Sequence, residues 1–276
     1  MERWNYEKMG APTKIGDHYF FFRNDGLQNQ SVLYIMDSID DPNPRVFLDP
    51  NELSEEGTAA LGRISFSKDG KYMAYGLSQS GSDWTDLYVK EVETGRVLDD
   101  VVRWLKFSGA NWDTASEGFY YCAYDKPAKG AELSGQNQFQ KVYYHKLGTP
   151  QSSDKLIYED KEHPLRYFNG YDDGDTGEYI FVDASEGTSG RALMFKRKDD
   201  RKPFRTIFKG FDNEYALAEV RDGKAYIYTN EAAPNFKLLC MDLDFNPETS
   251  KEILPEDAER MLQNVSFVGD YIIAIY

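Results

Sequence analysis

The sequence has no apolar stretch long enough to cross a membrane, since a transmembrane helix needs roughly 20 such residues. Its longest apolar runs, such as residues 271–276, are far shorter. The first residues, 1–6, also lack the apolar segment of a secretory signal peptide. We therefore expect no membrane partner for this chain.

Cysteine is scarce, with only Cys122 and Cys240 in 276 residues. Both lie in apolar, strand-like runs, so we expect buried free thiols and no disulfide framework. Free thiols fit a reducing compartment. We therefore expect a cytoplasmic protein, with a periplasmic location as the alternative.

Basic residues are outnumbered: 32 Lys and Arg stand against 47 Asp and Glu, for a formal net charge of −15. A surface this acidic repels nucleic-acid phosphates and anionic lipids. We expect no nucleic-acid partner, and we interpret the charge mainly as a source of solubility.

The motifs of hydrolytic catalysis are missing too. No Gly-x-Ser-x-Gly occurs, the turn that exposes the nucleophile of an α/β-hydrolase. The nearest match, Gly-Thr-Ser-Gly at residues 187–190, lies between two expected strands and indicates a hairpin loop. His18 and His163 lie in loop-like stretches and His145 in an alternating strand, none beside a candidate nucleophile. We expect no catalytic residue.

Metal and cofactor motifs are equally absent. The acidic stretch 172–178 resembles a calcium loop, but it lacks ligands at alternate positions and a glutamate at the twelfth. We expect a solvated hairpin turn there, with no metal and no cofactor.

Aromatic residues, by contrast, are abundant, at 15% of the chain, which favours strands. One unit recurs, and its clearest copy covers residues 63–98. An apolar strand at 63–67 leads through an Asp-Gly turn, a strong hairpin signal, into an aromatic strand at 72–76. An alternating strand at 87–92 and a short one at 96–98 follow.

The aromatic second strand returns at intervals of 45 to 60 residues. Its copies cover residues 19–22, 72–75, 119–124, 179–182, 225–228 and 271–276. Four-stranded units at this period are typical of propeller blades. The longest interval is explained by polar surface loops at 126–140 and 160–166. Helix is expected only at 255–262, where Pro255 would begin a turn.

The sequence thus predicts an all-β fold: an incomplete β-propeller of four-stranded antiparallel blades. About five and a half blades are expected, at residues 6–60, 61–106, 107–162, 163–212, 213–256 and, in part, 257–276. Aromatic side chains should lie between the blades, at Tyr75, Tyr121, Phe181 and Tyr228. The last blade stops in its second strand, so we expect a piece of a longer protein whose open blade edges self-associate.

Several motifs are more specific than the period. They are Asn-Asp-Gly-Leu-Gln-Asn-Gln-Ser-Val-Leu-Tyr at 24–34, Val-Phe-Leu-Asp-Pro-Asn at 46–51, Tyr-Gly-Leu-Ser at 75–78, Ser-Gly-Ser-Asp-Trp at 80–84 and Tyr-Tyr-His-Lys-Leu-Gly-Thr at 143–149. In order and spacing the chain resembles the propeller of the prolyl oligopeptidase family, from blade one into blade six.

The resemblance implies a two-domain serine endopeptidase that cleaves short peptides after proline. In that family a seven-bladed propeller covers an α/β-hydrolase domain, which carries a Ser-Asp-His triad and is not represented in these 276 residues. The expected partners are that hydrolase domain of the same polypeptide and short proline-containing peptides. The chain would be the non-catalytic propeller that gates the site and filters substrates by size.

The resemblance also implies contact residues. Phe107, Thr188 and Tyr167 fall on positions that line a substrate subsite, and Asp83 on a carboxylate that meets an arginine of the hydrolase domain. The alternative for Phe107 is a core aromatic at a strand end, and for Asp83 a loop cap. Thr188 and Ser185 depart from the residue types of animal members, which leaves the polarity of the subsite open.

Two other functions compete with the gating propeller. One is a stand-alone propeller that binds a peptide or protein, since fold alone does not decide function. The other is a related oligopeptidase with a different specificity. A Gly-x-Ser-x-Gly encoded downstream of Tyr276 would favour an enzyme, and a stop codon after a closing blade would favour the binding module.

Overall fold

The computed structural model describes residues 6–54, 58–79, 81–128, 130 and 135–276. These residues form 23 β-strands and three short 3₁₀ helices, with no α-helix among them. Contacts divide the chain into two compact units, one of residues 1–136 with 143–155 and the other of 137–142 with 156–276. The all-β expectation is confirmed.

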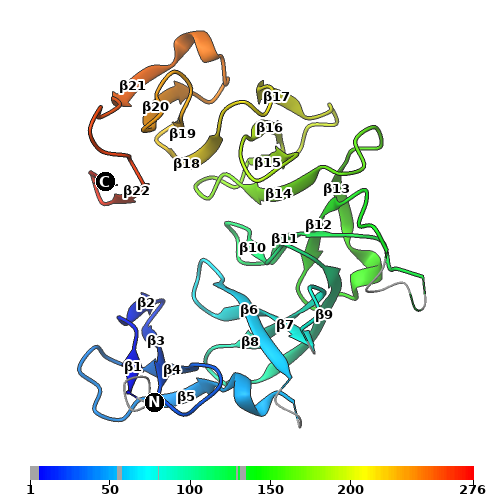
Figure 1. Ribbon diagram of the computed structural model, residues 1–276, viewed down its shortest axis with the longest axis vertical. Coiled ribbons are helices and arrows are strands. Elements are labelled where there is room, and N and C mark those ends of the chain that lie inside the picture. The colour runs from blue at the N-terminus through cyan, green and yellow to red at the C-terminus, as the bar shows by residue number, and fades with distance from the viewer. Residues whose placement is uncertain (1–5, 55–57, 80, 129, 131–134) are drawn as a thin grey trace. The chain divides into compact units, whose positions relative to one another are not determined.

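The first unit contains two complete antiparallel sheets (Figure 1). In one, the order is β1-β3-β4-β5, with β2 also paired to β3. Its strands are β1 (Lys8–Met9), β2 (Thr13–Ile15), β3 (His18–Asn24), β4 (Val32–Met36) and β5 (Arg45–Leu48), followed by the 3₁₀ helix η1 (Pro50–Glu52). The other sheet is a meander of β6 (Ala59–Phe66), β7 (Tyr72–Gln79), β8 (Thr85–Glu91) and β9 (Val97–Leu105).

The division between the units passes through the strands of a third sheet. It is again a four-stranded meander, and the 3₁₀ helix η2 precedes its last strand. Its elements are β10 (Asn111–Trp112), β11 (Gly118–Ala123), β12 (Lys141–Lys146), η2 (Gln151–Ser153) and β13 (Lys155–Glu159).

The second unit repeats the pattern (Figure 1). One four-stranded meander is β14 (Tyr167–Asp172), β15 (Tyr179–Ser185), β16 (Ala192–Arg197) and β17 (Arg205–Phe208). The next is β18 (Tyr215–Arg221), β19 (Lys224–Thr229), β20 (Lys237–Asp242), the 3₁₀ helix η3 (Pro247–Thr249) and β21 (Lys251–Leu254). A final two-stranded sheet pairs β22 (Asn264–Val268) with β23 (Tyr271–Ile275). Four-stranded antiparallel sheets are thus confirmed as the repeating unit.

The Asp-Gly turn between β6 and β7 shows why the repeat folds locally. Ser67 accepts the N–H of Gly70 at its carbonyl, and its hydroxyl donates to Asp69 at 2.7 Å. Gly70 has a φ of +71°, where a side chain is strained. A Cβ there would also lie 2.8 Å from the Cα of Gly16. The turn therefore needs glycine for conformation and for space.

Three apolar clusters lie between neighbouring sheets. In the first unit, Tyr75 (2% exposed) belongs to the cluster between the sheets β1–β5 and β6–β9, and Tyr121 (2%) to the one between β6–β9 and β10–β13. In the second unit, Phe181 (0%) lies between the sheets β14–β17 and β18–β21. Tyr228 lies outside that cluster and is half-buried, stacking on Phe236 and donating its hydroxyl to the carbonyl of Leu262.

Four sequence expectations are wrong in detail. Residues 255–262 form bends and irregular backbone, not a helical turn, because the carbonyl of Asp257 and the N–H of Leu262 form hydrogen bonds with Asn235 instead of within the segment. Cys240 is half-buried, unlike the buried Cys122, as is Tyr226, its partner in the register of β19 and β20. His18 begins a strand, β3, instead of lying in a loop. The turn expected to be solvated at 172–178 has a buried acidic end, described below.

Two sequence features lie partly outside the described residues. They are the motif at 80–84, without Ser80, and the polar loop at 126–140, without residues 129 and 131–134. In the part of the chain that is described, no helix is both long and apolar enough to span a membrane.

Candidate functional site

Asp83 and Phe107 lie at the same end of the strands of the sheet β6–β9. This end of the strands, where the loop between the second and third strand lies, is called the edge below. Asp83 is in the loop between β7 and β8, and Phe107 follows the end of β9. The register pairs Thr85 with Leu105, so the loop before β8 and the segment after β9 are neighbours. The structure therefore brings these two sequence-predicted residues to one edge of the first unit.

Phe107 is an exposed aromatic, with 73% of its surface accessible. This excludes the alternative that it is a core residue ending a strand. Its backbone has a φ of +57°, and Trp104 before it a φ of +66°, a region that bulky side chains rarely occupy. Strain at such positions costs of order 1–3 kcal/mol each and is concentrated at functional sites. The segment thus holds an apolar ring out toward solvent.

Asp83 is exposed and makes no hydrogen bond among the described residues. The loop is capped instead by Ser82, whose hydroxyl accepts the N–H of Trp84 at 3.1 Å. The loop-cap alternative for Asp83 therefore has no support from the geometry, and its carboxylate is available to a cation.

An aromatic cluster lies at the same edge as these two residues, and the sequence analysis missed it. Trp84 contacts Trp104 edge-on at 5.6 Å and Tyr124 at 6.1 Å between ring centroids. The ammonium of Lys106 lies 4.4 Å from the centre of the Trp84 ring, within cation–π range. The signal was present, since two of the four tryptophans of the chain flank the two predicted residues.

Tyr167 and Thr188 meet at an edge of the sheet β14–β17 in the second unit. The register places Tyr167 opposite Ser185, at the end of β15 where the loop containing Thr188 begins. The hydroxyl of Tyr167 donates to the carbonyl of Gly187, and Thr188 is exposed. Thr188 follows the second strand of its meander, as Asp83 does. This edge therefore corresponds in strand order to the edge that carries Asp83 and Phe107.

Gly190 fixes the loop that carries Thr188. Its φ is +82°, and a Cβ at this position would lie 1.8 Å from the carbonyl oxygen of Phe211. Its N–H donates to Glu214 at 2.7 Å. Ser189 lies in this same hairpin loop between β15 and β16, not on a strand–turn–helix elbow, as the sequence predicted.

A polar network frames the Tyr167 edge. Arg166 donates to Asp160 at 3.0 Å and to Glu186 at 2.8 Å, and its guanidinium lies 5.0 Å from the centre of the Phe211 ring. Burial works to raise the pKa of Asp160, but hydrogen bonds from Glu162 and His163 outweigh it and hold that pKa below its usual value. The charged carboxylate therefore orients the arginine beside Tyr167.

His145, on β12, is fully buried between two carboxylates of the first unit. Its Nδ1 lies 2.8 Å from Asp154 and its Nε2 lies 3.1 Å from Asp100. Burial alone would lower the pKa of His145, but hydrogen bonds to and charges of Asp154 and then Asp100 raise it above its usual value. Tyr121 donates to Asp154 at 2.7 Å. These contacts fix the imidazole inside the protein, away from solvent.

The acidic turn 172–178 is organised by Asp173, which is only 5% exposed. Its carboxylate accepts the N–H groups of Asp175, Gly177 and Tyr179 and the hydroxyl of Thr176. The hairpin turn is confirmed, but its acidic end is buried because local donors satisfy the carboxylate. Among the described residues no group of three or more ligand side chains could hold a metal ion.

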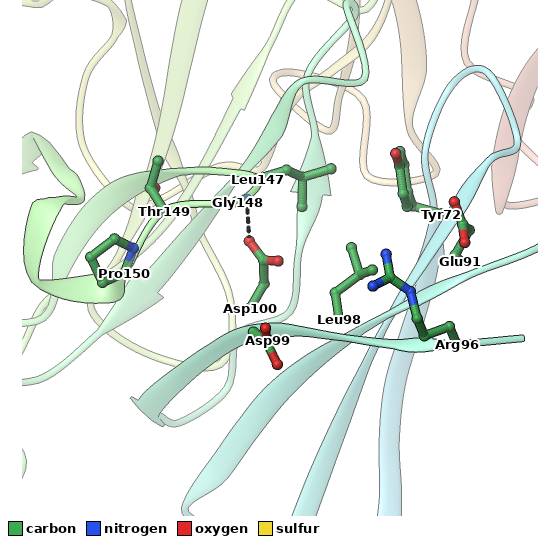
Figure 2. A pocket seen from close by; sticks show the side chains of 10 residues that line it. All are labelled: Tyr72, Glu91, Arg96, Leu98, Asp99, Asp100, Leu147, Gly148, Thr149 and Pro150. Atoms are coloured by element: carbon green, nitrogen blue, oxygen red, sulfur yellow. Dashed lines mark hydrogen bonds between the residues drawn. The ribbon is translucent and has the colours of Figure 1, made fainter.

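A pocket of the first unit, about 570 Å³, lies elsewhere (Figure 2). It is bordered by the start of β9 and by the turn between β12 and η2, at the edge opposite to Phe107. Its lining combines Arg96, Asp99 and Asp100 with the apolar Leu98 and Leu147, as Figure 2 shows. None of the four sequence-predicted site residues borders it.

Residues 1–276 match the family described as the N-terminal β-propeller domain of prolyl oligopeptidase. The chain is 41% identical over 278 residues to a prolyl endopeptidase of Elizabethkingia meningoseptica, covering all of this chain and 38% of that protein. It is 35% identical to prolyl oligopeptidase A of Amanita bisporigera, covering 99% of this chain and 40% of that protein.

Solved structures agree with these relatives. Prolyl oligopeptidase B of Galerina marginata, bound to a 35mer hydrolysis and macrocyclization substrate, superposes with a TM-score of 0.88 at 30% identity. The match covers 99% of this chain and 41% of that one. A structure from a study of inter-domain dynamics in two prolyl endopeptidases gives a TM-score of 0.88 at 27% identity. The chain thus spans about two fifths of the length of the proteins it matches.

Proposed function

The chain belongs to the prolyl oligopeptidase family, as its match to the N-terminal β-propeller domain over residues 1–276 shows, and from this we propose that it gates a serine peptidase that cleaves short peptides after proline. In this proposal an α/β-hydrolase domain of the same polypeptide supplies the nucleophile and the base. The propeller admits short proline-containing peptides and excludes folded chains. The match over the full length of the chain carries this proposal.

The exposed edges supply the contacts with substrate. Phe107 offers an apolar ring, and burying such a ring against a ligand is worth about 1.5–3 kcal/mol. Tyr167 and Thr188 would offer contacts of their own at the corresponding edge of the second unit, where the Thr188 hydroxyl adds polarity. Asp83, exposed and without a hydrogen bond, would pair with an arginine of the hydrolase domain.

The chain by itself should not cleave peptides, because it holds no nucleophile elbow. The test is incubation with a fluorogenic proline-containing peptide and with a serine-directed phosphonate. We expect neither turnover nor labelling. Stoichiometric labelling of a serine together with turnover would overturn the proposed division of labour.

The subsite itself is tested in the protein that joins this chain to its hydrolase domain. Phe107→Ala should lower kcat/KM about tenfold for extended peptides and less than about twofold for dipeptide substrates, because only the extended peptides reach the ring. The matched control is Val97→Ala, an exposed apolar residue at the other end of β9. Equal effects of Phe107→Ala on both substrate classes would exclude a subsite role.

Two further properties belong to the proposal. A cytoplasmic location is supported by the free thiols of Cys122 and Cys240. Self-association is supported by the sheet β22–β23, where Tyr271, Ile273 and Ile275 expose 44–76% of their surfaces. Cell fractionation tests the location, and the self-association is taken up below.

A further inference from the structure

The pocket at the start of β9 is a site of different chemistry from the proposed substrate edge. Its volume, about 570 Å³, is within the range of small-molecule sites. β9 runs roughly 20 Å from Leu98, at the pocket, to Leu105, before Phe107. The pocket therefore lies well away from Phe107, and the proposed gating function does not use it.

One side of the pocket carries an ordered charge pattern. Leu98 and Asp100 lie two positions apart on β9, and Arg96 lies just before the strand; Figure 2 shows all three side chains projecting to the same side. All three line the pocket, in the order cation, apolar residue, carboxylate (Figure 2).

The acidic end is a built feature and not a surface charge. Asp100 is only 6% exposed. Its Oδ1 accepts the N–H of Gly148 at 2.6 Å and lies 3.1 Å from Nε2 of His145. Its Oδ2 has no hydrogen-bond partner among the described residues, although Asp100 borders the pocket. A buried carboxylate with one available oxygen is suited to an ammonium group.

The basic end is equally available. Arg96 is exposed and forms no ion pair among the described residues. Glu91, which also lines the pocket, accepts a hydrogen bond from the hydroxyl of Thr94. The Arg96 guanidinium can therefore present two parallel N–H groups to a carboxylate.

The middle of the pocket is apolar. Leu98 and Leu147 face it from the two sheets, and Pro150 closes one end. The Tyr72 ring borders it and is held by stacking on Trp112 at 6.2 Å between centroids. A ligand that satisfies the lining thus needs a cationic end, an apolar middle and an anionic end.

We propose that this pocket binds a short zwitterionic peptide of two or three residues. Its free α-ammonium lies at Asp100, its free α-carboxylate at Arg96, and its side chains contact Leu98 and Tyr72. An extended tripeptide spans about 10 Å and carries its two opposite charges at its two ends. A simple anion or a simple amine would leave one charged end of the pocket unused.

The test is calorimetric titration of this chain with the tripeptide Ala-Leu-Ala. Titration to about 10 mM nearly saturates a site whose Kd is about 1 mM. We expect saturable binding of the free tripeptide, and at least about tenfold weaker binding of its N-acetylated and C-amidated forms, since each loses one charged contact. No binding of the free tripeptide, or equal binding of all three, would overturn the proposal.

A variant separates this pocket from binding elsewhere. Arg96→Gln should weaken the free tripeptide about tenfold and leave the C-amidated form unchanged. Arg103→Gln is the matched control, because Arg103 lies on β9, which begins just after Arg96, and pairs with Asp86 outside the pocket. Equal loss in both variants, or no loss in Arg96→Gln, would show that the peptide binds elsewhere and contradict the assignment. Asp100 is left intact because its contacts with His145 and Gly148 support the fold.

Discussion

At the scale of single residues, His145 connects two sheets of the first unit by charge. Asp100 comes from β9, and Asp154 precedes β13, with the imidazole between them. Removing one partner of a buried, hydrogen-bonded charge group typically costs 3–5 kcal/mol, because the other charges remain buried. His145 is thus better explained as a residue that stabilises the packing of the two sheets than as a catalytic base.

The buried group of His145, Asp100 and Asp154 should make the stability of the protein depend on pH. The pKa of His145 is raised above 6.5 in the folded state, so the folded protein binds more protons between 6.5 and the raised pKa. Its stabilisation is therefore complete below about pH 6.5 and is lost as the pH rises through the raised pKa. We expect the urea midpoint of the wild-type chain to fall over that window.

His145→Gln is the test of this origin. The variant should be less stable than wild type at every pH, and its urea midpoint should no longer fall above about pH 6.5. If it does not fold, an NMR titration of the imidazole in the wild-type chain measures the same pKa. The prediction is refuted if the urea midpoint of the variant falls with pH as much as that of the wild type. It is also refuted if the titration shows that the pKa of His145 is not raised.

Asp183, in the second unit, has its pKa shifted in the same direction as that of His145, but here burial is the cause. It is buried, and burial raises its pKa from 3.8 to about 6, against the hydrogen bond from Tyr171 and the charge of Arg191. The folded state then binds more protons than the unfolded state between these values, so stability falls as the pH rises through them. The difference corresponds to about 3 kcal/mol.

We expect Asp183→Asn to gain stability relative to wild type as the pH rises from about 4 to about 7, because the amide never becomes charged. Urea unfolding of both proteins across that range measures the difference. The same variant is the control for His145, because its urea midpoint should still fall above about pH 6.5, where His145 loses its proton. A constant difference between Asp183→Asn and wild type would contradict the raised pKa.

At the scale of the strands, β15 shows how one element serves both the core and the site. Phe181 is fully buried and contacts Phe245 edge-on at 5.4 Å between ring centroids. The end of the same strand holds Ser185 opposite Tyr167, where the Thr188 loop begins. The packing of the strand therefore positions the loop.

Phe181→Ala should cost about 3–5 kcal/mol of unfolding free energy, because it removes a ring from a filled interior. Phe107→Ala should cost no more than about 0.5 kcal/mol, since that ring is 73% exposed. Chemical denaturation of the two variants measures both values. Similar losses would show that Phe107 supports the fold, which would weaken its assignment to a substrate subsite.

At the scale of the whole molecule, the sheet β22–β23 presents apolar surface on a chain of net charge −15. Val268, Tyr271, Ile273 and Ile275 are 44–76% exposed. Burying a few hundred Å² of such surface is worth on the order of 5–10 kcal/mol before association costs. Charge repulsion opposes association, and salt screens it.

We therefore expect concentration-dependent self-association that strengthens with salt. Light scattering across a concentration series measures it, and a double substitution of Ile273 and Ile275 by lysine should abolish it. Leu27→Lys, at an exposed leucine of the first unit, is the control and should have no effect. A monomer at high micromolar concentration and high salt would show that this sheet tolerates exposure.

Much of the fold was predictable from the sequence because it depends on local rules. Alternation and the Asp-Gly turn at 69–70 identify strands and hairpins from neighbours in the chain. The six aromatic second strands were all found as strands, and the motifs named the family that the comparisons show. The error at 255–262 arose because backbone groups of this segment bond to Asn235, which local rules along the chain do not predict.

The sites needed the tertiary structure, because they join residues far apart in the chain. The sequence alone determined the repeat, the strand chemistry and the family, each readable within one blade length. Only the fold decided that Phe107 is exposed, that His145 meets Asp100 from another sheet, and that Arg96 and Asp100 border one pocket. The physical reason is that hydrogen bonding along the chain sets each strand, whereas packing between sheets sets which side chains meet and which remain exposed to solvent.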